Sequence, residues 1–131
     1  EANGVSAFIG HATRGLAVLP AFWLFVAVIA MTVFLSEFTS NTAQVATMTP
    51  VLAAMAPALG LDPKMLVVVC ALAASSAYMM PVGTPPNAIV FGTGMVRMPQ
   101  MVRAGFVLNL AGIAVITAIG WWLIPAVLGA R

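Results

Sequence analysis

Two short polar segments interrupt a chain that is otherwise apolar enough for a lipid bilayer. The first, residues 36–42, reads SEFTSNT, and the second, residues 81–87, reads PVGTPPN. Backbone at membrane depth must satisfy its own hydrogen bonds, so polar or unwound segments survive there only inside protein or beside water. Two such interruptions in one hydrophobic chain are typical of a solute site built from discontinuous helices. The pattern favours transport.

Charged side chains are scarce, with 5 Lys or Arg and 3 Asp or Glu among 131 residues. Four stretches carry no charge at all: 15–36, 38–61, 65–96 and 104–130. A helix that crosses a membrane needs roughly 20 apolar residues, and each stretch reaches that length. A water-soluble domain would need far more polar surface. The sequence therefore predicts an all-α, multi-pass integral membrane protein.

Several classes of protein are excluded by what the chain lacks. Its cations are dispersed without a basic block, so nucleic acid is not an expected partner. The single cysteine, Cys70, permits no internal disulfide and is expected to pack within an apolar run. No cluster of His, Cys or carboxylates exists to perform chemistry, so the chain is not expected to be an enzyme. Because the sequence opens at Glu1 without an initiator Met, we expect it to be a piece of a longer protein.

The second interruption is interpreted from length. Arg97 follows it closely, and at ~1.5 Å per residue the arm 88–96 covers about half of a ~30 Å hydrocarbon core. Segment 81–87 is therefore expected to be the unwound middle of one crossing, a discontinuous transmembrane helix over 63–96 with half-helices at 65–80 and 88–96.

The remaining boundaries follow from capping and composition. Gly60 is expected to end a helix, and Asp62 with Pro63 to begin the next, because Asp caps and Pro at the first position loses no needed hydrogen bond. Residues 104–128 are expected to form one continuous transmembrane helix. Residues 1–19 are interpreted as an interfacial helix or linker.

The first interruption lies in a helical hairpin expected over 20–58, and the residues leave two readings open. One is a pair of full helices joined by an exposed turn, and the other is a re-entrant hairpin whose tip stops near the midplane. Glu37 stands alone there without a Lys or Arg beside it, which leans mildly toward burial. Its carboxyl could couple protons or bond backbone amides.

Both interruptions offer polar groups next to helix starts, expected at 43–59 and 88–96. Helix N-terminal amides suit an anion, and Ser, Thr and Asn side chains can donate to a carboxylate or accept toward a cation. Pro85 and Pro86 would leave the carbonyls of Val82 and Gly83 without helical partners. Free carbonyls with hydroxyl or amide oxygens make a site for a hard cation such as sodium. The plainer readings are an exposed capping turn and a structural kink.

Two motifs together resemble the divalent anion/sodium symporter family: Glu37 to Ala43, and Met80 to Gly92. Members of that family are sodium-coupled carriers of dicarboxylates, citrate or sulfate. The resemblance covers essentially the whole chain, including the Leu61-Asp62-Pro63 entry. It implies two inverted repeats, each with a re-entrant hairpin and a broken helix, of which this chain is similar to the C-terminal one. Residues 20–131 would then be the C-terminal part of the transport domain.

The resemblance also implies roles for individual residues. Substrate carboxylate would be bound by residues at both interruptions: Ser40, Asn41, Thr42, Thr84 and Pro85. Sodium would be held by oxygens from the same segments: Ser36, Thr39, Asn41, Gly83 and Pro85. The family works as a homodimer with an elevator-like movement of the transport domain. The N-terminal hairpin and its broken helix are not in this chain, so transport is expected to require that other half.

We therefore predict the C-terminal half of a sodium-coupled carrier of di- or tricarboxylates, such as succinate, malate or citrate-like anions, in a bacterial inner (plasma) membrane. One alternative is a proton-coupled anion carrier that uses Glu37. Another is a non-transporting structural subunit of a membrane assembly.

Overall fold

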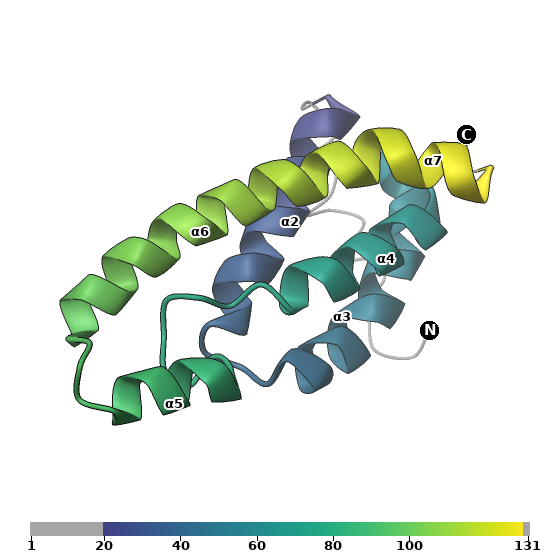
Figure 1. Ribbon diagram of the computed structural model, residues 1–131. Coiled ribbons are helices and arrows are strands. Elements are labelled where there is room, and N and C mark those ends of the chain that lie inside the picture. The colour runs from purple at the N-terminus through teal and green to yellow at the C-terminus, as the bar shows by residue number, and fades with distance from the viewer. Residues whose placement is uncertain (1–19, 130–131) are drawn as a thin grey trace.

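A computed structural model describes residues 20–129, so the interfacial segment predicted at 1–19 lies outside the described residues. The described part contains helices and no strands (Figure 1). In chain order they are α2 (Ala21–Ser36), α3 (Asn41–Met55), the 3₁₀ turn η1 (Ala56–Leu59), α4 (Pro63–Ala74), α5 (Pro85–Gly92), α6 (Met98–Ala118), the π-helical turn η2 (Ile119–Leu123) and α7 (Ile124–Leu128).

The core lies where α2, α3 and α4 meet and α6 crosses them. Phe25 and Ile29 from α2 are fully buried against Leu66 and Val69 of α4 in one hydrophobic cluster. Cys70 is fully buried in the same cluster, as expected. Helix α4 packs against both α2 and α3, while the short α5 lies apart at one end (Figure 1).

The start of α4 matches its predicted capping. Asp62 Oδ1 accepts hydrogen bonds from the backbone amides of Lys64 at 2.7 Å and Met65 at 3.4 Å, and Pro63 is the first helical residue. Gly60 has a φ of 67°, in the left-handed region that favours glycine. Both signals are therefore confirmed.

The last helix begins earlier than predicted, at Met98 instead of residue 104. Pro99 lies in the first turn, and Gln100 Oε1 accepts a hydrogen bond from the Arg97 amide at 3.0 Å. Proline in a first turn and a glutamine that reaches back to the capping residue are helix-start signals, so Arg103 lies within the helix. The helix also changes to a π-helical turn at Ile119–Leu123, where Gly120 lies directly against Phe25 and Val69.

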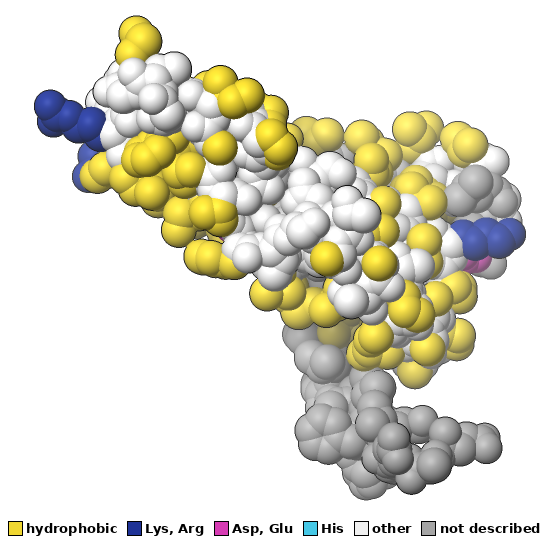
Figure 2. All heavy atoms as spheres, turned by 90° about the horizontal axis from the view of Figure 1, so that it is seen from below, with side chains coloured by type: hydrophobic (Ala, Val, Ile, Leu, Met, Phe, Trp, Pro, Cys, Tyr) yellow, Lys and Arg dark blue, Asp and Glu magenta, His cyan; other side chains and the backbone are white. Residues whose placement is uncertain are grey.

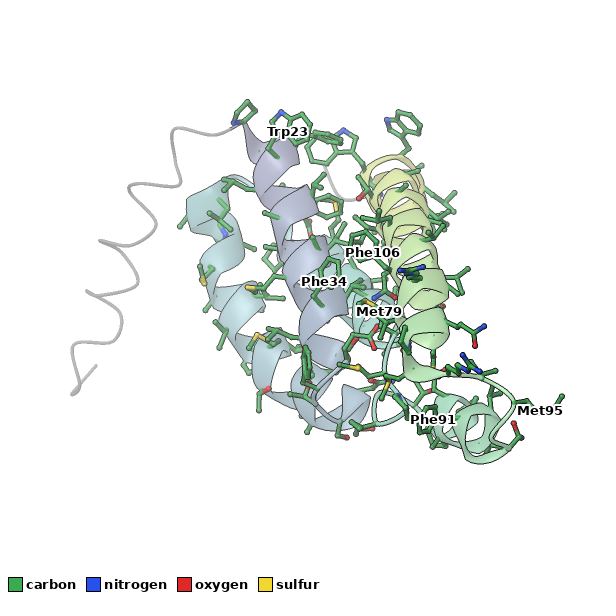
Figure 3. All side chains as sticks on the ribbon, turned by 90° about the vertical axis from the view of Figure 1, so that its left-hand side faces the viewer. Trp23, Phe34, Met79, Phe91, Met95 and Phe106 are labelled. Carbon is green, nitrogen blue, oxygen red and sulfur yellow. The ribbon has the colours of Figure 1, made fainter. Side chains whose placement is uncertain are left out.

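Two helices of the described part are long and apolar enough to cross a membrane, Asn41–Leu59 and Met98–Val127. Figure 2 shows apolar side chains over the viewed face, with Lys and Arg at its two opposite ends. Aromatic rings gather at the end that carries Trp23 (Figure 3), where Trp121 packs against Phe22 with ring centroids 5.1 Å apart. An apolar body with aromatic residues at one end and charges at its extremities is consistent with a membrane protein.

Candidate functional site

The turn between α2 and α3 ends in an uncapped helix start. Ser40 has the extended backbone of a capping residue, and its carbonyl accepts the Gln44 amide at 2.9 Å. Its side chain makes no capping hydrogen bond, in contrast to Asp62 at the start of α4. The Ser40 hydroxyl and the first amides of α3 therefore remain available to a ligand.

The side chain of Gln44 stabilises this turn through hydrogen bonds to α2 and to the turn itself. Its side chain is buried and donates to the Thr32 carbonyl at 2.8 Å, while its Oε1 accepts from the Thr39 hydroxyl at 2.9 Å. Gln44 is not among the site residues predicted from sequence. The available signal was an uncharged amide in an apolar helix, one turn after the tip.

The interruption of the second helix begins and ends earlier in the chain than predicted. Helix α4 ends at Ala74, well before the expected end at residue 80, and α5 starts at Pro85 instead of residue 88. The non-helical segment is thus 75–84, and Pro85, Pro86 and Asn87 form the first turn of α5.

The side chain of Glu37 explains why α4 ends so soon. Its carboxylate accepts backbone N–H bonds from Tyr78 at 2.8 Å, Met79 at 3.0 Å and Met80 at 2.9 Å. In a continuous helix these amides would bond to carbonyls four residues earlier. Glu37 therefore bonds backbone amides, one of the roles considered for it, but those of a segment 41 to 43 residues away.

Asn87 satisfies carbonyl groups in the same segment. Its Nδ2 donates to the carbonyls of Ala77 at 3.1 Å and Met80 at 3.0 Å. Backbone polar groups that are shielded from water need partners. Glu37 and Asn87 supply them here, the first to amides and the second to carbonyls.

The start of α5 differs chemically from that of α3. Thr84 is an extended capping residue whose side chain makes no capping hydrogen bond. Pro85 and Pro86 have no N–H, so the first turn of α5 can offer the amide of Asn87 but none from its prolines. The two helix starts are therefore not equivalent anion sites, and α3 has more free donors.

The residues implied in sodium binding lie on both segments. Ser36 is buried and donates its hydroxyl to the Val33 carbonyl at 2.7 Å, which leaves its oxygen lone pairs free. Thr39 is committed to bonds within the hairpin. Asn41 Oδ1 is buried without a hydrogen-bond partner, and a buried oxygen of that kind is expected to have a partner. Gly83 is buried beside Glu37.

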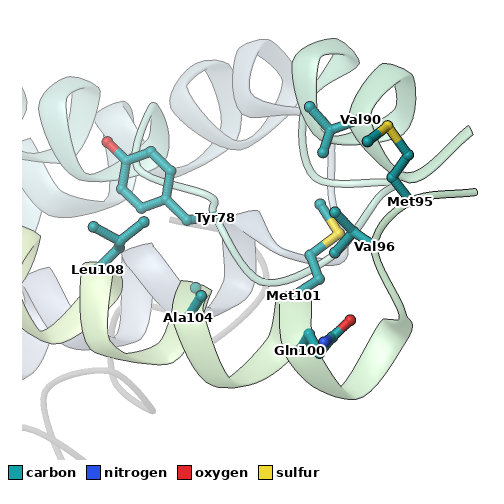
Figure 4. A pocket seen from close by; sticks show the side chains of 9 residues that line it. Tyr78, Val90, Met95, Val96, Gln100, Met101, Ala104 and Leu108 are labelled. Atoms are coloured by element: carbon teal, nitrogen blue, oxygen red, sulfur yellow. The ribbon is translucent and has the colours of Figure 1, made fainter. Parts of the chain in front are cut away.

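Asn41 and Thr42 line a hollow of about 420 Å³ together with Ala71 and Ser75 near the end of α4. Ser75 is not among the site residues predicted from sequence. A second hollow, of about 430 Å³, lies between Tyr78, the end of α5 and α6 (Figure 4). Its walls are mainly apolar, and α5 contributes no buried residue in the described structure.

Comparison with known proteins identifies the family. The model described as "Sodium:sulfate symporter transmembrane region" matches residues 1–128. The chain belongs to this family, which confirms the resemblance to divalent anion/sodium symporters.

Among curated relatives, a protein named sodium-dependent dicarboxylate transporter SdcS from Staphylococcus saprophyticus is 39% identical over 97% of this chain and 24% of its own length. Solute carrier family 13 member 2 from Rattus norvegicus is 41% identical over 95% of this chain and 22% of its own length. The chain thus spans about a quarter or less of the relatives it matches. These are transporters and not enzymes, as predicted.

Proposed function

We propose that this chain forms the C-terminal part of the transport domain of a sodium-coupled symporter for di- or tricarboxylates such as succinate, malate or citrate. The observation that carries the proposal is a set of hydrogen bonds between two non-helical segments, 37–40 and 75–84. The carboxylate of Glu37 in the first segment accepts them from backbone amides of the second. Next to this junction, the capping hydroxyls of Ser40 and Thr84 make no capping bond. The name of the Staphylococcus saprophyticus relative, a sodium-dependent dicarboxylate transporter, favours dicarboxylate over sulfate as the substrate.

The anion is assigned to the helix starts. The first turn of α3 offers backbone amides with the hydroxyls of Ser40 and Thr42 and the amide of Asn41, all at the positive end of the helix dipole. Thr84 adds a hydroxyl from the second segment, and Pro85 beside it gives a rigid apolar contact. This arrangement suits a carboxylate group, because planar oxygens can accept from several donors at once.

Sodium is assigned as a co-transported substrate on neutral oxygens. Ser36, Thr39 and Asn41 provide side-chain or carbonyl oxygens from the hairpin. Gly83 provides a carbonyl from the second segment, and Pro85 provides one from the first turn of α5. The partnerless Oδ1 of Asn41 supports this assignment, since a cation would supply its missing contact. Bound sodium would also offset the charge of a neighbouring carboxylate.

The rest of the carrier is proposed to complete the site. In this account α2 and α3 form a re-entrant hairpin, 63–96 is a broken helix, and the remaining protein supplies a second hairpin. The exposure of α5 and the hollow beside α6 support further protein packing there. We assign the protein to the bacterial inner membrane, as a multi-pass homodimer within the lipid bilayer.

The experiment measures uptake of labelled succinate by proteoliposomes that contain the complete protein, at varied sodium and pH. Asn41→Ala and Thr84→Ala should each raise the half-saturating succinate or sodium concentration about tenfold or more, as expected for loss of one polar contact. Thr93→Ala is a matched control, because Thr93 lies at the other end of α5 and its hydroxyl bonds only to nearby backbone. It donates to the Val90 carbonyl at 2.7 Å and accepts from the Met95 amide at 3.2 Å.

Two results would support the alternatives instead. Unchanged affinity and sodium dependence in both site variants would favour a structural role for the interruptions. Uptake that ignores sodium, follows pH and is lost in Glu37→Gln would favour proton coupling.

A further inference from the structure

Glu37 is a buried carboxylate that the proposed binding site does not use. Its side chain is only 1% exposed. Besides the amides of Tyr78, Met79 and Met80, it accepts a hydrogen bond from Asn109 Nδ2 of α6 at 2.7 Å. Met79 donates to both carboxylate oxygens, at 3.0 Å each. One side chain thus joins three elements: the hairpin turn, the 75–84 segment and α6.

The Glu37 carboxylate and the backbone amides of the 75–84 segment each need the other as a hydrogen-bond partner. A carboxylate is costly to bury unless several donors bond to it, and Glu37 receives N–H groups from four residues. The three backbone amides have in turn left the helical pattern of α4, so they need an acceptor. Hydrogen bonds to an ionised acceptor are short and strong. All four neighbours are donors, which suits the carboxylate and not the carboxylic acid.

The position of Glu37 relates this junction to the ligand-binding residues. In sequence, Glu37 directly follows Ser36 and precedes Ser40 and Asn41 by three and four residues. On the other side, the amides that it holds precede Gly83 and Thr84 by a few residues. The carboxylate also lies close to Gly83 of the second segment. If Gly83 carried a β-carbon, that atom would lie 3.3 Å from Glu37 Oε2 and 3.0 Å from the Ala77 β-carbon.

We infer that Glu37 is a positioning residue that fixes the hairpin tip and the 75–84 segment at one separation, so that oxygens from both segments can hold one cation. This inference rests on the proposed function. In this role the carboxylate of Glu37 is a structural hydrogen-bond acceptor for backbone amides of the second segment. Asn109 extends the same junction to α6, so the three elements are expected to move as one body.

The first test is hydrogen–deuterium exchange of the complete protein, which needs no transport activity. In the wild type the amides of Tyr78, Met79 and Met80 should exchange slowly. Glu37→Gln replaces one acceptor oxygen by an NH₂ group that faces donors, so exchange over 75–84 should rise about tenfold or more. Peptides from the buried face of α2 should keep their wild-type rates.

A matched control is Asp62→Asn, because Asp62 also accepts backbone amides but at the far end of α4. It should leave exchange over 75–84 unchanged. Asn109→Leu is the second variant. It removes one donor and keeps the three backbone bonds, so it should give a smaller rise confined to 75–84 and the facing part of α6.

The second test is sodium dependence of succinate uptake, normalised to the amount of folded protein. Glu37→Gln should raise the half-saturating sodium concentration about tenfold or more, with a smaller change in maximum rate. A purely supporting role would lower the rate or the amount of protein and leave that concentration unchanged.

The outcomes separate this inference from the proposed function. Faster exchange at 75–84 in a protein without sodium-dependent uptake would retain the junction and refute the proposed function. Sodium-dependent uptake with wild-type exchange and wild-type sodium affinity in Glu37→Gln would refute the positioning role. Exchange that rises equally in every helix of Glu37→Gln, while Asn109→Leu changes nothing, would refute it too.

Discussion

Two glycines of α6 provide a matched test of how closely this helix approaches the 75–84 segment. At Gly105 an added β-carbon would lie 2.5 Å from Met79 Cα and would overlap the Tyr78 carbonyl group. At Gly112 the nearest atom is the Ser76 β-carbon at 4.0 Å, an ordinary contact. Both positions are inside Met98–Ala118. The pair Gly105→Ala and Gly112→Ala therefore differs mainly in what the new methyl group meets.

The expected difference in stability between the two variants follows from these contacts. Alanine favours a helix over glycine by about 1 kcal/mol, and this gain is shared by both variants. Overpacking costs about 1–3 kcal/mol, and the upper end applies at Gly105 because backbone atoms cannot rotate aside. We expect Gly112→Ala to be neutral or slightly stabilising. Gly105→Ala should be less stable than Gly112→Ala by about 3 kcal/mol.

The assay is thermal unfolding of the complete protein in one detergent, followed by intrinsic tryptophan fluorescence. The midpoint of Gly105→Ala should fall clearly below the wild type, and that of Gly112→Ala should not. Deuterium exchange over 75–84 should rise in Gly105→Ala alone. Equal midpoints for the two variants would refute the close approach of α6 to this segment.

Four further outcomes are expected. Asn87→Leu removes the donor to two carbonyls of the broken segment, so the unfolding midpoint should fall as for a loss of about 1–3 kcal/mol; a wild-type midpoint would contradict this. Gln44→Leu should loosen the hairpin turn, measured as faster exchange of the 37–40 amides, whereas unchanged rates would argue against this stabilisation. Gly120→Ala should lower the unfolding midpoint, because its methyl group would overlap the buried ring of Phe25; an unchanged midpoint would show that this contact is not so close. Cys70 should resist maleimide in the folded protein and react after denaturation, since it is buried; rapid labelling of folded protein would disprove its placement.

The sequence was sufficient for features that depend on neighbouring residues. Gly60 and the pair Asp62 and Pro63 act through local backbone geometry, and the structure has them as predicted. The dense prolines at 85 and 86 similarly required some interruption of the helix. The start of α6 is also set locally, by Pro99 and Gln100, and the prediction of a helix from residue 104 did not use that signal.

Features set by distant partners could not be derived in this way. The end of α4 depends on Glu37, whose bonds to Tyr78 and Met80 cross 41 and 43 residues of sequence. Its bond to Asn109 crosses 72. Apolar periodicity continued to Met80, so sequence alone predicted a longer helix. The hydrogen bonds from the backbone amides of 78–80 to the distant Glu37 carboxylate outweigh that local preference for a helix.

The interpretation of Glu37 illustrates the same limit. A lone acid in an apolar chain indicates either a titrating group or a structural acceptor, and the sequence left both open. The four donors around the carboxylate favour the structural role. Sequence could not name these donors, because three of them are backbone amides that carry no residue signature.

Equilibrium binding of labelled succinate to the purified complete protein, at several sodium concentrations, shows whether the anion and the cation bind next to each other. If the two segments hold a cation and a carboxylate side by side, each ligand must raise the affinity of the other by the same factor. Succinate affinity should increase with sodium concentration, and this coupling should be lost in Asn41→Ala. Succinate affinity that is the same with and without sodium would contradict this expectation.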